Sequence, residues 1–105
     1  MLIELEVVIP RRDNQGQPFS RTAWREIERR LRELGGGFTR QDGLAGQWVT
    51  GERTYSDVSR RYTVALQSWR QFPAWLEIVE WARVEFRQEA LYIRVQGGAE
   101  ILGDS

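Results

Sequence analysis

The chain contains no cysteine and no histidine among its 105 residues. Without cysteine there can be no disulfide, no thiol nucleophile and no thiolate ligand for a metal. Without histidine the chain also lacks the commonest general base and the usual nitrogen ligand of zinc, copper and haem iron. Only a site built from oxygen ligands, for magnesium or calcium, stays chemically open, and we predict neither a metal nor another cofactor.

Net charge and long apolar runs are missing as well. Fifteen basic and fifteen acidic side chains cancel, so no overall field attracts DNA or RNA and nucleic-acid binding is disfavoured. No stretch approaches the about 18 apolar residues of a membrane span. The first six residues carry two acids where a signal peptide has basic residues. We therefore expect a cytoplasmic protein without a membrane partner.

What the chain does contain is typical of one small globular domain. Apolar residues make up 41% and charged residues 29%, a balance that supports a modest core, and no linker divides residues 1–105. Residues 2–9 alternate as a strand with Ile3 and Leu5 on its inner face. A helix follows, capped by Ser20 or Thr22 and ended by the glycines at 35–37. Its apolar stripe consists of Trp24, Ile27, Leu31 and Leu34.

The second half of the pattern is less regular. A second strand begins at 38–40, is interrupted by glycines and resumes over 47–50; a polar connection follows over 51–59 and a third strand over 60–66. Pro73 opens a second helix with an apolar face of Trp75, Leu76, Val79, Ala82 and Phe86. The last strand, 91–95, is expected to bury Leu91, Ile93 and Val95. The order β-α-β-β-α-β predicts an α+β, ferredoxin-like split βαβ fold, an antiparallel sheet with two helices on one face.

Such a fold leaves the other sheet face uncovered. That face is predicted to present mixed charges and some smaller side chains: Glu4, Glu6, Val8, Arg61, Thr63, Ala65, Tyr92, Arg94 and Gln96. It could be a solvated face with cross-strand ion pairs. Alternatively, two-fold symmetry would set Glu4 and Glu6 of one copy near Arg61 and Arg94 of another, giving a homodimer interface that includes Tyr92. An RNA-reading sheet would need more aromatic residues than this one tyrosine.

A polar pocket at one end of the sheet is a second hypothesis. Its predicted lining is Trp48, Tyr55, Asp57, Arg60 and Gln88, with Arg40 close by. An arginine-bearing pocket suits a carboxylate or phosphate ligand. A surface hydrogen-bond network that fixes the polar connection is the alternative interpretation.

Other residue groups favour plain structural roles. Asp13-Asn14-Gln15-Gly16 lacks the alternating ligands and closing glutamate of a calcium loop and indicates a turn. Trp24 and Trp75 are expected in the core, whereas Trp81, at the margin of the second helix, could mark a partner surface. Several arginines lie in and before the first helix, at positions 11, 12, 21, 25, 29, 30 and 32, but Glu26, Glu28 and Glu33 dilute any nucleic-acid patch.

The chain resembles a group of small bacterial proteins of about 100 residues whose function is uncharacterised. The resemblance rests on Ile9-Pro10-x-x-Asp13-Asn14-x-Gly16, Gly36-Gly37-Phe38-Thr39, Gly46-Gln47-Trp48, Asp57-x-Ser59-Arg60-x-Tyr62 and Phe86-Arg87-Gln88-Glu89-Ala90-x-Tyr92. It implies a recurrent natural fold and assigns no catalytic residue.

Together these observations favour a non-catalytic interaction or regulatory module, homodimeric, whose partner is a second copy or another protein. The alternative is a small-molecule-binding protein or cofactor-independent enzyme of the dimeric α/β-barrel type, with the pocket at Arg60 as its site.

Overall fold

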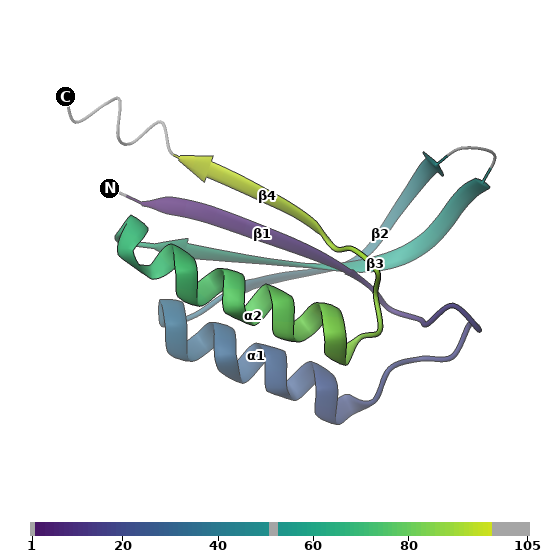
Figure 1. Ribbon diagram of the computed structural model, residues 1–105, viewed down its shortest axis with the longest axis horizontal. Coiled ribbons are helices and arrows are strands. Elements are labelled where there is room, and N and C mark those ends of the chain that lie inside the picture. The colour runs from purple at the N-terminus through teal and green to yellow at the C-terminus, as the bar shows by residue number, and fades with distance from the viewer. Residues whose placement is uncertain (1, 51–52, 98–105) are drawn as a thin grey trace.

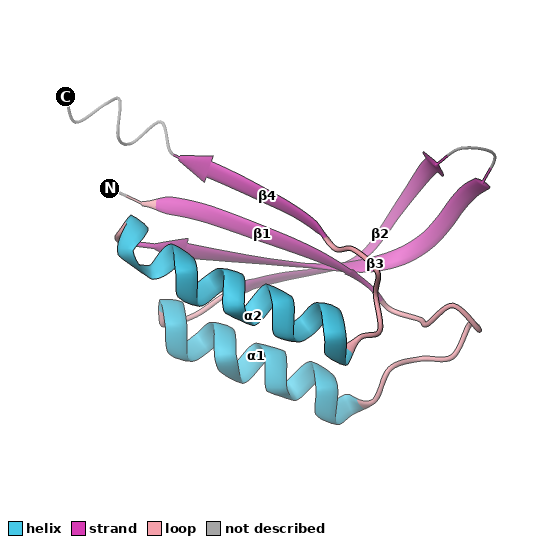
Figure 2. Ribbon diagram, in the orientation of Figure 1, coloured by secondary structure: helices cyan, strands magenta, loops and turns pink. Residues whose placement is uncertain are grey.

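The architecture consists of one sheet covered on one side by helices (Figure 1). A computed structural model describes residues 2–50 and 53–97, with the backbone alone described at 44–50, 53–58 and 97. Within these residues, strands β1 (Ile3–Pro10), β2 (Thr39–Thr50), β3 (Arg53–Leu66) and β4 (Tyr92–Gly97) form an antiparallel sheet in the order β2-β3-β1-β4. Helices α1 (Arg21–Gly35) and α2 (Phe72–Glu85) lie side by side on one face, and a short 3₁₀ turn, η1 (Trp69–Gln71), leads into α2 (Figure 2). The predicted ferredoxin-like α+β fold is confirmed.

Helix α1 forms where its sequence signals predict it. The Ser20 hydroxyl accepts a hydrogen bond from the Ala23 backbone N–H at 3.2 Å, which caps the first turn. Gly36 ends the helix with φ 79°, a left-handed conformation that costs glycine little. Ile27 and Leu31 are fully buried, whereas Trp24 packs at the edge of the core and is only partly buried.

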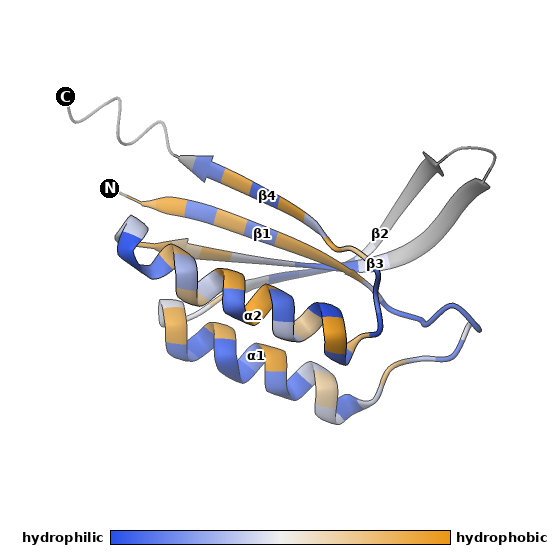
Figure 3. Ribbon diagram, in the orientation of Figure 1, coloured by the Kyte–Doolittle hydropathy of each residue, from blue (hydrophilic) through white to orange (hydrophobic). Residues whose placement is uncertain are grey.

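The core lies between the helices and the inner face of β1 and β3. Ile3, Leu5, Val7 and Ile9 of β1 are buried beside Tyr62, Val64 and Leu66 of β3, as their alternation predicts. Register confirms the pairing, since Leu5 lies opposite Val64 and Val7 opposite Tyr62. Figure 3 shows the corresponding apolar and polar bands along β1. From α2, the core receives Trp75, Ala82 and Phe86.

The prediction of a buried final strand is wrong. Ile93 and Val95 do point to the helix side, since they lie opposite Val7 and Leu5, but they are 37% and 41% exposed. Leu76 of α2, also predicted to be buried, is 39% exposed, and Leu91 is half-buried. The physical reason is position: β4 pairs only with β1 at the edge of the described sheet, and the helix layer does not extend over it. Alternation fixes the side to which a residue points, but not whether anything covers it.

The middle of the chain also differs from the prediction. Strand β2 is continuous from Thr39 to Thr50, with a register shift between Asp42 and Leu44 where Gly43 takes φ 78°. The expected polar connection over 51–59 is largely strand, since β3 begins at Arg53. Only residues 59–66 of β3 pair with β1, so the rest of β2 and β3 forms a two-stranded arm that leaves the body of the fold (Figure 1). An arm of this kind needs no apolar face, so it lacks the alternating apolar pattern from which strands are predicted.

The segment between β1 and α1 is held by short-range contacts. The Asp13 carboxylate accepts hydrogen bonds from the backbone N–H groups of Gln15 and Gln17, both at 2.9 Å, and Gly16 has φ 80°. An isolated bridge pairs Arg12 with Pro18. The predicted turn is thus confirmed. Among the helices that the structure describes, none is long and apolar enough to cross a membrane. The sequence also predicts that residues 99–102 add a short edge strand or pack beneath the sheet, but these residues lie outside the part of the chain that the structure describes.

Candidate functional site

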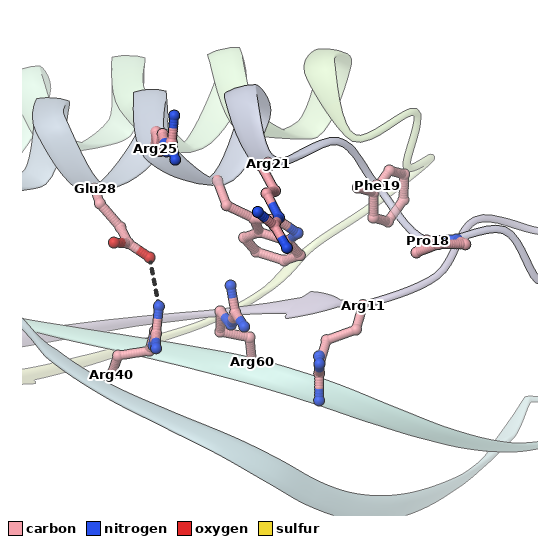
Figure 4. Close-up of a pocket in the computed structure, with 9 residues that line it drawn as sticks. Arg11, Pro18, Phe19, Arg21, Arg25, Glu28, Arg40 and Arg60 are labelled. Carbon is pink, nitrogen blue, oxygen red and sulfur yellow. Dashed lines mark hydrogen bonds and ion pairs between the residues drawn. The ribbon is translucent and has the colours of Figure 1, made fainter.

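A cavity of about 430 Å³ opens between the first half of α1, the strands β2 and β3, and the segment after β1 (Figure 4). Five of the residues that line it are arginines, from four different parts of the chain: Arg11, Arg21, Arg25, Arg40 and Arg60. The other lining residues are Pro18, Phe19, Trp24 and Glu28. In Figure 4, the side chains of Arg11, Arg21 and Arg60 lie in the space between the helix and the sheet. We refer to this cavity as the arginine pocket.

Arg60 forms the inner wall of the pocket and is fixed by two neighbours. Its Nε and Nη2 donate hydrogen bonds to the two carboxylate oxygens of Asp42 at 2.7 and 3.1 Å. Its guanidinium also lies over the Trp24 ring, 4.3 Å from the ring centroid, in a cation–π contact. The hydrogen bonds from Arg60 hold the pKa of the Asp42 carboxyl below its usual range. Arg60 is only 9% exposed, so this pair keeps a nearly buried cation neutralised on one side.

Glu28 organises the opposite wall. One of its oxygens, Oε2, accepts hydrogen bonds from the Tyr62 hydroxyl at 2.7 Å and from Arg40 Nη1 at 3.0 Å. Burial, together with the Glu28 carboxylate, raises the pKa of Tyr62 well above its usual value. The raised pKa favours the protonated phenol, the form that donates the hydrogen bond to Glu28. Arg40 thus forms an ion pair with a carboxylate of the chain, as Arg60 does.

The other three arginines are in a different situation. Within residues 2–50 and 53–97, Arg11, Arg21 and Arg25 have no carboxylate within ion-pair distance among the side chains described. The pocket thus gathers five guanidiniums against Glu28 and Asp42, although the whole chain is neutral. A positive field at this one place follows from the arrangement and not from composition.

The remaining arginines of α1 are satisfied elsewhere. Arg29 bridges Glu26 and Glu33, Arg30 binds Glu26, and the hydrogen bonds from both lower the pKa of Glu26 to about 2. Arg30 also lies 4.2 Å over the Trp81 ring, which explains how that tryptophan is partly covered at the margin of α2. The third, Arg32, lies 5.6 Å over the Phe38 ring. The arginine-rich stretch considered for nucleic acid therefore contains a pocket group, a pair bound to carboxylates, and Arg12 and Arg32, which have other contacts.

The predicted pocket residues are not all brought together. Arg60 lines the arginine pocket, and so does the nearby Arg40. Gln88 does not line it: its side chain donates to the Phe86 carbonyl just after α2. Trp48, Tyr55 and Asp57 lie on the arm, where side chains are outside the description, so their part in a pocket stays a prediction. The sequence analysis placed Arg11, Arg21 and Arg25 in a possible nucleic-acid patch and not in the pocket. The available signal for a shared site was that Arg21 and Arg25 are four residues apart, on one face of the helix, beside Trp24 and Glu28.

The predicted interface residues do share the uncovered sheet face. Register places Glu6 opposite Arg94 and Val8 opposite both Arg61 and Tyr92. Arg61 Nε lies 3.8 Å from Glu6, so part of the charge complementarity is used within one chain. Val8, expected to be exposed on this face, is buried, and the neighbouring Ser59 is buried too, so this end of the face is covered. Whether the face binds a second copy stays a prediction.

A second candidate surface, the β4 edge patch, consists of Leu76, Ile93 and Val95. Ile93 and Val95 lie on the helix-facing side of β4. Leu76 is five residues before Trp81 on α2, about 140° away around the helix, and Trp81 is on the flank that contacts Arg30 of α1. Within the described sheet, the outer backbone edge of β4 has no strand beside it. An unpaired edge with apolar side chains favours pairing with another chain.

Comparison by sequence finds no family model that matches this chain and no similar curated protein. Comparison by structure finds the same fold in solved proteins. The divalent cation tolerance protein CutA1 from Thermus thermophilus matches with a TM-score of 0.63 and 17% identity, over 98% of this chain and 93% of that one. CutA from Xylella fastidiosa matches with a TM-score of 0.64 and 8% identity, over 97% and 91%.

A further solved structure with this fold is a phage SAM lyase in complex with S-methyl-5'-thioadenosine. It matches with a TM-score of 0.64 and 13% identity, over 90% of this chain and 80% of that one. Identities this low show a shared architecture and do not transfer a site or an activity. The chain is therefore similar in fold, over nearly its whole length, to CutA proteins and to a phage lyase.

Proposed function

We propose that this protein is a self-associating interaction module that forms a homodimer through the β4 edge patch. One observation carries the proposal: Ile93 and Val95 are more than a third exposed on a strand whose outer edge is unpaired among the described residues. Edge strands are commonly protected from pairing with another chain by charged side chains, proline or bulges. Here the only charged residue of β4 is Arg94, on the opposite face.

A second copy of the chain fits this edge well. Two β4 strands placed antiparallel about a two-fold axis would pair their free backbone groups and extend the sheet across both copies. The apolar residues on the helix side of each copy would then pack against each other. Tyr92 and Arg94 would lie at the same junction on the other face, which brings part of the predicted interface into the dimer.

The test is the dissociation constant of the dimer, measured by sedimentation equilibrium and native mass spectrometry. Because a charge at a desolvated apolar contact removes a central anchor, Ile93→Glu should weaken association by at least about tenfold. The matched control is Val84→Glu, at a site on α2 that is 62% exposed and outside the patch, which should leave the constant unchanged.

Two outcomes would contradict the proposal. A wild-type chain that stays monomeric at concentrations well above micromolar does not self-associate in the way proposed. If Arg94→Glu dissociates the dimer while Ile93→Glu leaves it intact, the uncovered sheet face, and not the β4 edge patch, holds the copies together.

A further inference from the structure

The arginine pocket has more positive charge than the chain itself neutralises. Arg60 and Arg40 are paired with Asp42 and Glu28, whereas Arg11, Arg21 and Arg25 face the same cavity without a carboxylate partner among the described side chains. Like charges held around a partly enclosed space repel each other, and the repulsion is relieved only by an anion or by screening. The pocket volume of about 430 Å³ is within the range of small-molecule sites.

The guanidinium groups of the pocket indicate which class of anionic ligand fits it. All fifteen basic residues of the chain are arginines. A guanidinium presents planar, paired donors that match two oxygens of a phosphate or carboxylate at once. Arg21 and Arg25 lie in the first two turns of α1, where the positive end of the helix dipole adds to the attraction for an anion.

The aromatic residues of the pocket are already occupied. The Trp24 ring has Arg60 over it at 4.3 Å and Phe86 at a centroid distance of 4.5 Å. The Phe19 ring makes an edge contact with Phe86 at 4.9 Å. Neither ring is therefore presented for stacking on a nucleobase, so the charged group of the ligand, and not a base, must supply recognition.

A continuous nucleic-acid track is not formed either. Arg29 and Arg30, one turn beyond the pocket on α1, are held by Glu26 and Glu33, and Arg12 donates to the Gly16 carbonyl. Arg32, further along α1, lies over the Phe38 ring at 5.6 Å. A phosphate backbone would therefore meet one localised group of cations and then arginines that mostly have partners within the chain. The arrangement suits a compact ligand with its charge concentrated at one end.

We propose that the arginine pocket binds a small organic phosphate or diphosphate through its phosphoryl group. Arg21, Arg25 and Arg11 contact the phosphoryl oxygens from the helix and the preceding segment. Arg60, oriented by Asp42 and Trp24, forms the inner wall. Nothing covalent happens in this step: the site exchanges solvent and counterions for the ligand. The site is separate from the β4 edge patch, so it does not depend on self-association.

The experiment is a calorimetric titration of the full chain with inorganic pyrophosphate. Saturable one-to-one binding is expected at low salt, and it should weaken as salt is added. Because a charged hydrogen bond to a phosphate oxygen is strong, Arg21→Gln and Arg25→Gln should each weaken binding by about tenfold or more. Both side chains are exposed, and an unchanged circular dichroism spectrum and urea midpoint will show that each variant is folded.

Arg29→Gln is the matched control, since Arg29 is on the same helix but is paired on its outer face. It should leave the affinity for pyrophosphate within about twofold of wild type. Sulfate and citrate, titrated in parallel, distinguish a phosphoryl site from a site for any anion. Comparable affinity for all three ions would contradict the assignment to phosphates.

Three further results would overturn the proposal. The first is that binding does not saturate at pyrophosphate concentrations up to about 10 mM, which would mean that the pocket has no specific affinity for a phosphoryl group. The second is equal weakening by Arg29→Gln and Arg21→Gln, which would indicate diffuse attraction to α1. The third is tighter binding of a single-stranded oligonucleotide that Arg29→Gln weakens as strongly as Arg21→Gln, which would indicate a nucleic-acid surface.

Discussion

The two ends of the covered face of β3 differ in kind although they belong to one strand and one side of the sheet. At one end, Leu66 and Val64 are fully buried, and the C-terminal end of α1 packs on them: a Cβ at Gly35 would lie 3.7 Å from Val64 Cβ and 3.8 Å from Leu66 Cδ2. At the other end, Tyr62 and Arg60 reach towards Glu28, Asp42 and Trp24 around the arginine pocket. Alternate residues of β3 thus form part of the apolar core at one end of the strand and place charged and polar side chains at the other.

This difference shows how a small sheet can contain a polar site without weakening its core. The apolar end contributes burial of side chains, the dominant favourable term in folding. On the covered face of the polar end, Arg60 is paired with Asp42 and Tyr62 with Glu28, whereas the buried hydroxyl of Ser59, on the opposite face, has no hydrogen-bond partner among the described residues. We therefore expect mutations to have their largest effects on stability at the apolar end and progressively smaller effects towards the pocket.

The largest effect is expected for Leu5→Ala. Leu5 is fully buried opposite Val64, so its truncation should lower the free energy of unfolding by about 2–5 kcal/mol, measured by urea denaturation. The control is Ile93→Ala on uncovered β4, measured on the monomeric species, where the loss should stay below about 1 kcal/mol. Equal losses of unfolding free energy at the two sites would contradict the description of β4 as less buried than β1.

An intermediate effect is expected for Asp42→Asn, which removes the anion beside Arg60. Asp42 is 36% exposed, so the loss at pH 7 should be about 1–2 kcal/mol, below that of a fully buried pair. The folded-state pKa of Asp42 lies below its ordinary value of 3.8, so its contribution is complete above that pH. The contribution is lost as the pH falls through the folded-state pKa.

The measurement for Asp42 is the difference in unfolding free energy between wild type and Asp42→Asn as a function of pH. This difference should be constant near neutrality and should shrink as the pH falls below 3.8. A difference that stays the same down to strongly acidic pH would mean that the negative charge of Asp42 does not stabilise Arg60.

The smallest effect is expected for Arg25→Gln at the open side of the pocket. Arg25 is exposed and has no ion-pair partner among the described side chains, so unfolding should change by less than about 0.5 kcal/mol. If the site holds repelling guanidiniums, the change should be a small gain in stability, largest at low salt. A loss above about 1 kcal/mol, by the same urea assay, would place Arg25 among the groups that hold the fold together.

Much of the fold could be predicted because local signals agree with one another. Alternation in β1, the Ser20 cap and Gly36 stop of α1, and Pro73 at the start of α2 each have a local physical cause that the structure confirms. Coverage of β4 could not be predicted in this way, since it depends on where a helix lies relative to the edge of the sheet. The arm was missed because its strands pair mainly with each other and need no apolar face, so they lack the alternating apolar pattern from which strands are predicted.

The candidate site was predictable only in part. Arg60 was predicted as a member of a polar, arginine-bearing pocket, and in the structure it lines the arginine pocket and is bound by Asp42. Arg11, Arg21 and Arg25 are separated along the chain. The path of the segment between β1 and α1 determines which of the seven arginines in and before α1 line the same cavity, and the sequence does not reveal that path. Composition could not reveal this, because the neutral total hides a local excess of positive charge.

The segment after β1 has one more consequence, which concerns conformational entropy. Asp13 binds two backbone N–H groups, Arg12 donates to the Gly16 carbonyl at 3.0 Å, and the Arg12–Pro18 bridge closes the base of the turn. Pro18 and Phe19, which line the cavity, are therefore already ordered when the chain has folded. A molecule entering the cavity would meet a wall that needs little further ordering, and ordering a loop is one of the main costs that binding must overcome. The entropy of ordering this wall is thus lost during folding, before an occupant arrives, and does not have to be lost again on binding.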